Sequence, residues 1–171
     1  MQMVKKVCLM LFLVWFGMLV FMPKKELYYK LEEVLARQEI QIDGEKLKEG
    51  WFSLEVENLS VSIKGIKIAT VEKVDFFTLL FSSKMHIQNI LLDDSLKGKA
   101  PNRTENATLA HTVLSPLSVS LDAQCDFGGV EGKAKIKERS VRLDLIEAKN
   151  IDMIKSQLKQ DEKGWYYEAS F

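Results

Sequence analysis

A period of two runs through the second half of the chain and constrains its fold more than any other feature. Over residues 116–146, apolar or small residues alternate with polar ones, and Gly128-Gly129 interrupts them with a hairpin signal. Pairing across this turn places Leu121 opposite Ile136. A second turn at Glu138-Arg139 keeps the same face apolar in a third strand. The pattern predicts an antiparallel meander with one dry and one solvated face.

The dry face of this meander is the candidate binding surface. Several of its side chains are small, which leaves room for a bound acyl chain. A packed helix at 27–35 or at 151–158 would use the same room, so both alternatives stay open. The residues expected to face this lipid or helix groove are Leu121, Ala123, Cys125, Gly132, Ala134, Ile136 and Leu143.

Ahead of the strands, an amphipathic helix is predicted over residues 24–37. Its apolar face consists of Leu27, Leu31, Val34 and Leu35. A short strand at 39–42 follows and leads into Asp43-Gly44, a pair that is typical of a turn.

Alternation resumes after this helix. The apolar parity changes between Val56 and Leu59, which predicts a bulge. Lys64-Gly65 then predicts a two-residue hairpin loop that places Val61 opposite Ile68.

An apolar run at 76–81, Phe-Phe-Thr-Leu-Leu-Phe, joins two strands. We expect a single turn over 78–83 and a further strand over 85–92. The run either caps a small core or plugs one end of the groove next to a membrane. Residues 93–112 are polar and small and predict a linker. Further on, Asn150 is expected to cap a short helix, and residues 165–171 to form a last strand.

Residues 7–22 form an uncharged apolar segment near the start of the chain. The lysines that flank it are Lys5, Lys6, Lys24 and Lys25. A cleaved secretory signal is the alternative to an anchor, but it would end in small residues, which the segment lacks. The pattern therefore predicts a retained N-terminal transmembrane helix over residues 1–23.

The chemistry-bearing residues are few and scattered. Lys+Arg and Asp+Glu both number 24 and are interleaved, which argues against nucleic acid as a partner. No motif of a hydrolase, nucleotide-binding or metal site is present, so no catalytic residue, cofactor or metal is expected. We expect His86 to face solvent on a strand and His111 to lie free in the linker. Cys8 and Cys125 have no disulfide or metal spacing.

Three segments carry a resemblance to a known family: ATVEKVDFFTLLF at 69–81, KMHIQNILLD at 84–93 and GVEGKAKI at 129–136. The order of anchor, helix and sheet, with these strands, resembles the AsmA-like envelope proteins, in particular the N subunit of type II secretion systems. The resemblance implies a twisted sheet with an apolar concave side that serves as a lipid groove. It implies no catalytic residues.

Together these observations predict a mainly β protein with an anchor at 1–23, a helix at 24–38 and an antiparallel β domain at 39–171. The expected function is that of a non-enzymatic, membrane-anchored cell-envelope protein, similar to a secretion accessory subunit. The alternative is a lipid-binding or lipid-transfer module. The expected location is the inner membrane, single-pass, with the β domain in the periplasm. Expected partners are the membrane, other envelope proteins and lipid.

Overall fold

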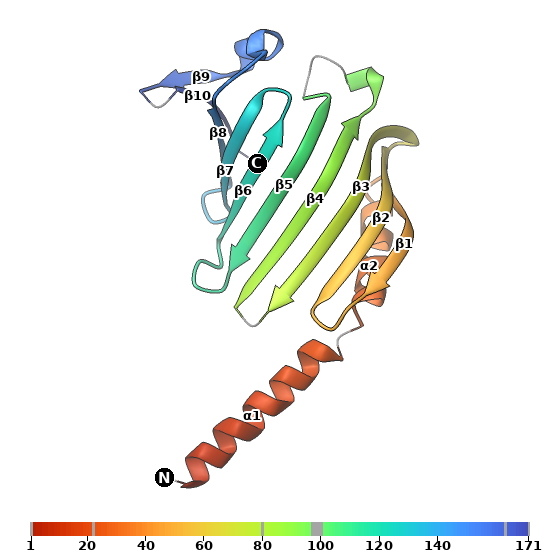
Figure 1. The fold of residues 1–171 in the computed structure, drawn as a ribbon, viewed down its shortest axis with the longest axis vertical. Coiled ribbons are helices and arrows are strands. Elements are labelled where there is room, and N and C mark those ends of the chain that lie inside the picture. Colours follow the sequence, from red (N-terminus) through yellow and green to blue (C-terminus); the bar gives the residue numbers. More distant parts are fainter. Residues whose placement is uncertain (1, 22, 80, 97–100, 163, 171) are drawn as a thin grey trace.

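Two N-terminal helices are followed by one ten-stranded antiparallel sheet (Figure 1). The mainly β fold predicted from the sequence is therefore confirmed. The computed structural model describes residues 2–21, 23–79, 81–96, 101–162 and 164–170. The elements are α1 Gln2–Val20, α2 Lys24–Ala36, β1 Ile40–Glu49, β2 Ser53–Ile63, β3 Ile66–Leu79, β4 Ser82–Leu92, η1 Asp94–Leu96, β5 Arg103–Thr112, β6 Ser118–Cys125, β7 Gly128–Lys135, β8 Ser140–Ile146, η2 Ile151–Met153, η3 Lys155–Gln157, β9 Lys159–Asp161 and β10 Gly164–Ser170.

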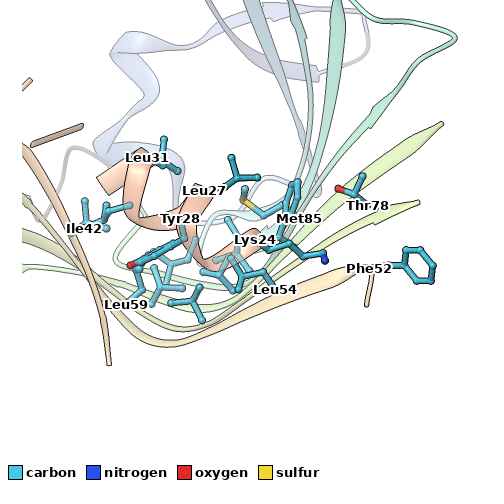
Figure 2. A pocket seen from close by; sticks show the side chains of 17 residues that line it. Lys24, Leu27, Tyr28, Leu31, Ile42, Phe52, Leu54, Leu59, Thr78 and Met85 are labelled. Atoms are coloured by element: carbon cyan, nitrogen blue, oxygen red, sulfur yellow. The ribbon is translucent and has the colours of Figure 1, made fainter. Parts of the chain in front are cut away.

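The sheet is a meander up to its last two strands. Each strand from β1 to β8 pairs with the next one along the chain, and β10 then lies between β8 and β9. α2, predicted as an amphipathic helix, packs against β1 and β2. The face of the sheet that α2 covers is called the inner face, and the strands curve beneath the helix (Figure 2).

The change of apolar parity predicted in β2 is confirmed, but a one-strand bulge is not its cause. Leu54 and Val56 before the change, and Leu59 and Val61 after it, line the same cavity on the inner face. Between them Asn58 has a φ of 53°, in the left-handed region that Asn tolerates. The register between β1 and β2 is the same on both sides of Asn58, so the two strands change parity together.

The same change of parity recurs in the neighbouring strands, at a row of residues called the polar seam: Glu45, Asn58, Glu72 and Asn89. Asn89 also has a positive φ, of 51°. The Nδ2 of Asn58 donates to Glu45 Oε2 at 2.7 Å, and that of Asn89 donates to Glu72 Oε2 at 2.6 Å. In β5 the register shifts between Thr104 and Asn106, which ends the seam.

The turn predicted at Asp43-Gly44 is wrong, because both residues lie inside β1, opposite Ser60 and Leu59. Glycine is required there by close packing, since a Cβ at Gly44 would overlap the Val56 side chain and would lie 3.1 Å from Tyr28 Oη. A glycine that makes room inside a strand carries the same sequence signal as one that makes a turn.

The hairpin loop predicted at Lys64-Gly65 is confirmed, with Ile63 opposite Ile66. Val61, however, pairs with Ala69 and not with Ile68, because the register shifts between Val61 and Ser62.

Two segments predicted as irregular are strands. The single turn expected over 78–83 is shorter than predicted, because β3 continues to Leu79 and pairs it with Ser82 of β4. Within the linker expected at 93–112, the described residues include the short helix η1 and the central strand β5, which pairs with β4 and β6. Residues 97–100 of that range lie outside the described residues. The sequence of β5 does not show the alternation of large apolar and polar residues that predicts a strand, because polar residues lie on its outer face and small residues on its inner face.

In the second half the faces are predicted correctly, and the register is wrong. Leu121 lies opposite Gly132, not Ile136, and the turn between β6 and β7 lies at residues 126–127. Gly128 begins β7 with a φ of 105°, and its Cβ would lie 2.5 Å from the carbonyl oxygen of Glu147. The double glycine therefore marks a close backbone contact and not the turn itself.

The last segment also differs in detail. The short helix expected after Asn150 consists of the two 3-10 turns η2 and η3, and the Asn150 side chain makes no capping hydrogen bond. The final strand is confirmed as β10, and β9 covers its outer edge only at residues 164–166. Phe171 lies outside the described residues.

The apolar N-terminal segment is helical, as expected, and forms α1. Within the described part of the chain, no helix combines the length and the apolar character needed to cross a membrane.

A candidate apolar trough on the inner face

The inner face carries two adjoining cavities. The first, of about 600 Å³, lies between α2 and strands β1–β4 (Figure 2), and apart from Lys24 and Thr78 its lining is apolar or aromatic. The second, of about 550 Å³, lies over β4–β8 and is also lined by Ile154, Gln157 and Leu158, from the segment that contains η2 and η3. Both volumes fall within the range of small-molecule sites.

β4 joins the two cavities into one surface. Ile87 and Ile90 line both of them, so the apolar lining continues across the middle of the sheet without a polar barrier. We call the combined surface the trough. It follows the dry face of a single sheet layer, which a globular protein would ordinarily cover with a second layer.

The trough is covered only near its two ends. α2 lies over β1 and β2. Ile154, Gln157 and Leu158, from the segment that contains η2 and η3, line the second cavity. Among the described residues only six apolar side chains are buried, and none is less than 2% exposed. The buried six are Tyr28, Leu54, Val56, Val71, Ala107 and Phe127. The sheet therefore has a thin core and a broad apolar surface.

α2 is turned with its leucines toward the first cavity. Leu27 and Leu31 line this cavity and remain 47% and 51% exposed, while Tyr28 packs against the sheet and is 8% exposed. The predicted apolar face of the helix thus points into open space and does not fill it. The alternative in which a helix of this chain occupies the groove is not what the structure shows for α2.

Tyr28 is the one buried side chain of the described residues with an unsatisfied polar atom. Its Oη makes no hydrogen bond of good geometry. Burial raises the pKa of this phenol, the nearby Glu32 and Asp43 carboxylates raise it further, and a smaller interaction with the Gly44 backbone lowers it. The hydroxyl therefore stays neutral between α2 and β1.

Of the residues predicted to face the groove, some line the second cavity and others do not. Leu121, Ala123, Cys125 and Leu143 line the second cavity. Gly132 lies between Leu121 and Leu143, and a Cβ on it would contact both side chains. Ala134 pairs with Val119 and Val141 in the same face but does not line a cavity. Ile136 lines neither of these two cavities, since it lies in the β7–β8 turn and is 48% exposed.

Sequence reasoning missed the whole first cavity. Its strands change parity at the polar seam, so no single alternation marks their inner residues. A repeated signal was available: Val56-Glu57-Asn58-Leu59 and Ile87-Gln88-Asn89-Ile90 share the order apolar, polar, Asn, apolar. In both repeats the two apolar residues line the first cavity.

The outer face is polar and carries a lattice of ion pairs. Lys73 Nζ lies 2.8 Å from Glu55 Oε2, and Lys48 Nζ lies 3.0 Å from Glu55 Oε1. These hydrogen bonds from Lys73 and Lys48 lower the pKa of Glu55 to about 2. Farther along the sheet, Arg142 pairs with Asp144 and Asp161. The contrast with the inner face confirms the predicted dry and wet sides of the sheet.

The histidines and Cys125 have ordinary surroundings. His86 is half-buried on β4, where its Nδ1 lies 2.9 Å from Thr108 Oγ1. His111 is not free in a linker, because it lies on β5 with its Nε2 3.2 Å from the carbonyl oxygen of Pro116. Burial raises the pKa of the Cys125 thiol, which donates to Gly128 O. The described residues contain no group of three or more His, Cys, Asp or Glu that could hold a metal.

Comparisons of the chain with protein-family models, with curated proteins and with solved structures find no match. The trough is therefore the feature from which a function can be inferred.

Proposed function

We propose that this protein is a non-enzymatic lipid-binding module whose trough holds an acyl chain. The observation that carries the proposal is the continuous apolar lining, about 600 Å³ and about 550 Å³ in its two parts, on a sheet face that has no second layer. Each CH₂ group transferred from water to this lining contributes about 0.8 kcal/mol. A long acyl chain therefore has a large driving force to occupy it.

An acyl chain suits the lining better than a polar metabolite does. A site for a polar ligand places a few hydrogen-bonding groups among its apolar residues. The polar side chains of the trough are few, namely Lys24 and Thr78 in the first cavity and Thr104 and Gln157 in the second. A ligand without polar groups along most of its length fits this distribution.

The proposal includes a setting at a membrane of the cell envelope, on the periplasmic side of an inner membrane. The support for this setting is the resemblance of residues 69–93 and 129–136 to AsmA-like proteins, together with the apolar α1 segment. Under this proposal the trough would bind or pass on lipid and would have no catalytic role.

Native mass spectrometry of the full chain, purified from membranes in mild detergent, tests the proposal. The wild-type protein should carry lipid adducts. Ala123→Trp places a large side chain inside the second cavity and should reduce the adducts several-fold. Gln124→Trp, at the exposed neighbouring position on the outer face, is the matched control and should retain them.

A wild-type protein without lipid adducts, or equal adducts in Ala123→Trp and the control, would contradict the proposal. Thermal melting of both variants verifies that each has folded, so that a loss of lipid is not a loss of structure.

A further inference from the structure

One end of the sheet carries a continuous set of exposed apolar side chains. Three connections at this end carry no charge at their described residues 50–52, 81 and 113–117, whereas the β7–β8 turn at 136–139 carries Lys137, Glu138 and Arg139. Trp51 is 75% exposed and Leu114 is 92% exposed. We call the described apolar residues of this end the rim: Trp51, Phe52, Phe81, Val113, Leu114 and Leu117.

Backbone hydrogen bonds hold the rim together. The amide of Thr78 donates to Phe52 O at 2.9 Å, and the amide of Val113 donates to Phe81 O at 2.9 Å. Each apolar tip is thus tied to the neighbouring strand and is not a separate loose loop.

α1 extends this apolar surface. It lies beyond the strand ends of the rim (Figure 1), with the Trp15 ring centroid 6.1 Å from that of Phe81 and the Phe16 centroid 5.8 Å from that of Phe52. Away from these contacts α1 remains open to solvent, since Leu9 and Met10 are 60% and 69% exposed. A helix that is apolar all round needs an apolar surrounding on all sides.

The charges around this surface specify its partner. Residues 1–25 contain four lysines and no acidic residue. Lys5 and Lys6 lie near one end of α1, and Lys24 and Lys25 follow the other. Lysines that flank an apolar segment can reach anionic headgroups while the apolar part stays in hydrocarbon, and Trp is favoured at that boundary.

We propose that the rim and α1 together dock the sheet end-on onto an anionic lipid bilayer. The rim residues enter the boundary between headgroups and acyl chains, and the lysines lie at headgroup level. Phe52 belongs both to the rim and to the lining of the first cavity, so docking places one end of the trough at the bilayer. The docking itself does not depend on lipid binding in the trough.

The three tryptophans supply the test, because they report from α1, the rim and β10. The full chain with Trp15→Phe and Trp165→Phe keeps Trp51 as its only tryptophan. The chain with Trp15→Phe and Trp51→Phe keeps Trp165, which lies near the opposite end of the sheet. Both are bound to vesicles of phosphatidylcholine and phosphatidylglycerol, with or without brominated acyl chains.

Trp51 emission should shift to shorter wavelength and be quenched by the brominated lipid, whereas Trp165 emission should change little. If the protein floats with the vesicles and Trp51 is not quenched, α1 alone holds it and the docking is wrong. Equal quenching of Trp165 would also overturn the proposal, as would a chain that does not bind and self-associates instead.

A second arm uses exposed apolar residues at the two ends of the sheet. Leu114→Glu at the rim should lower the fraction bound to vesicles by about tenfold, because a carboxylate is costly at the acyl boundary. Ile66→Glu, 63% exposed at the opposite end, should leave it unchanged. Equal binding of the two variants to vesicles would contradict the docking proposal. A loss of lipid adducts from the trough would count against the proposed function and not against the docking.

Discussion

In β1–β4 and in β5–β8, apolar side chains reach the inner face in two different ways. Strands β6–β8 alternate regularly, β5 does so beyond its register shift at Thr104/Asn106, and the inner residues of these strands include the small Ala107 and Ala123. The earlier strands change parity at the polar seam and place larger side chains under α2. Four of the six buried apolar residues belong to this α2 half, and two to the later half. The fold is therefore held mainly by the α2 half, although the two halves have similar room for a ligand, about 600 Å³ and about 550 Å³.

The claim that the α2 half holds the fold is tested most strongly by placing a charged residue in each half. Val56 is 4% exposed beneath α2, so Val56→Asp should destabilise the protein by more than about 4 kcal/mol and unfold it. Leu121→Asp, at a half-buried position of the open trough, should cost clearly less because water can reach the carboxylate. Urea denaturation followed by circular dichroism measures both, and equal losses would refute the assignment of stability to the α2 half.

The register of the later half is tested by its paired glycines. Gly128→Ala should cost roughly 2–3 kcal/mol, because φ is 105° and the new Cβ would press against the carbonyl oxygens of Ile146 and Glu147. Gly129→Ala should cost under about 1 kcal/mol, since its nearest neighbour would lie at 3.5 Å. Thermal melts that show the reverse order would contradict the register observed here.

The polar seam predicts an intermediate effect in the earlier half. Asn58→Ala should destabilise the protein by about 1–2 kcal/mol. Alanine adopts the left-handed conformation of this position less readily than Asn does, and the substitution removes the hydrogen bond to Glu45. Asn58→Gly keeps the conformation and should cost less. If both variants have the same stability in chemical denaturation, the left-handed backbone at the seam is not what Asn58 provides.

The alkylation rates of the two cysteines distinguish the trough, which contains Cys125, from the exposed surface of α1, which contains Cys8. Cys8 is exposed, and Cys125 is partly buried with a raised thiol pKa, so Cys8 should be alkylated faster at neutral pH. Because the thiolate is the reactive form, Cys125 alkylation should rise with pH beyond the range of an ordinary thiol. Added fatty acid should slow it further without affecting Cys8. Mass spectrometry of the alkylated peptides would contradict this if both sites reacted alike.

The smallest expected change in stability is that of Tyr28→Phe. Tyr28→Phe removes a buried hydroxyl without a hydrogen-bond partner among the described residues, so stability should change by less than about 0.5 kcal/mol or rise slightly. Tyr28→Ala should instead cost about 3–5 kcal/mol through the cavity that it leaves under α2. A large loss in Tyr28→Phe, measured by urea denaturation, would mean that the hydroxyl has a partner in solution.

Alternation predicts which face of a strand is dry, and for that reason the sheet and its inner face could be predicted from the sequence. The register could not, because a shift by an even number of residues leaves every side chain on the same face. The pairing of Leu121 with Gly132 instead of Ile136 is such a shift. In the sequence Gly128 has the signal of a turn residue, although its role is a close contact with the backbone at Ile146 and Glu147.

The candidate site was predicted in its later half only. Leu121, Ala123 and Leu143 follow the alternation and line the second cavity. The first cavity and strand β5 were missed, because a left-handed Asn reverses the parity within a strand and because β5 carries Thr104 and Ala107 where larger apolar residues were sought. The strand propensity of single residues predicts neither the change of parity nor the small inner residues of β5, since both depend on the neighbouring strands.

Photolabelling with a fatty acid that carries a diazirine in its chain is the most direct test of the proposed acyl site. After irradiation with the full-length protein, peptide mass spectrometry locates the labelled residues. The proposal predicts adducts in both halves of the trough, at residues such as Ile87, Ala107 and Leu121. Adducts confined to α1 and the rim, or spread over the outer face, would contradict the claim that the trough holds an acyl chain.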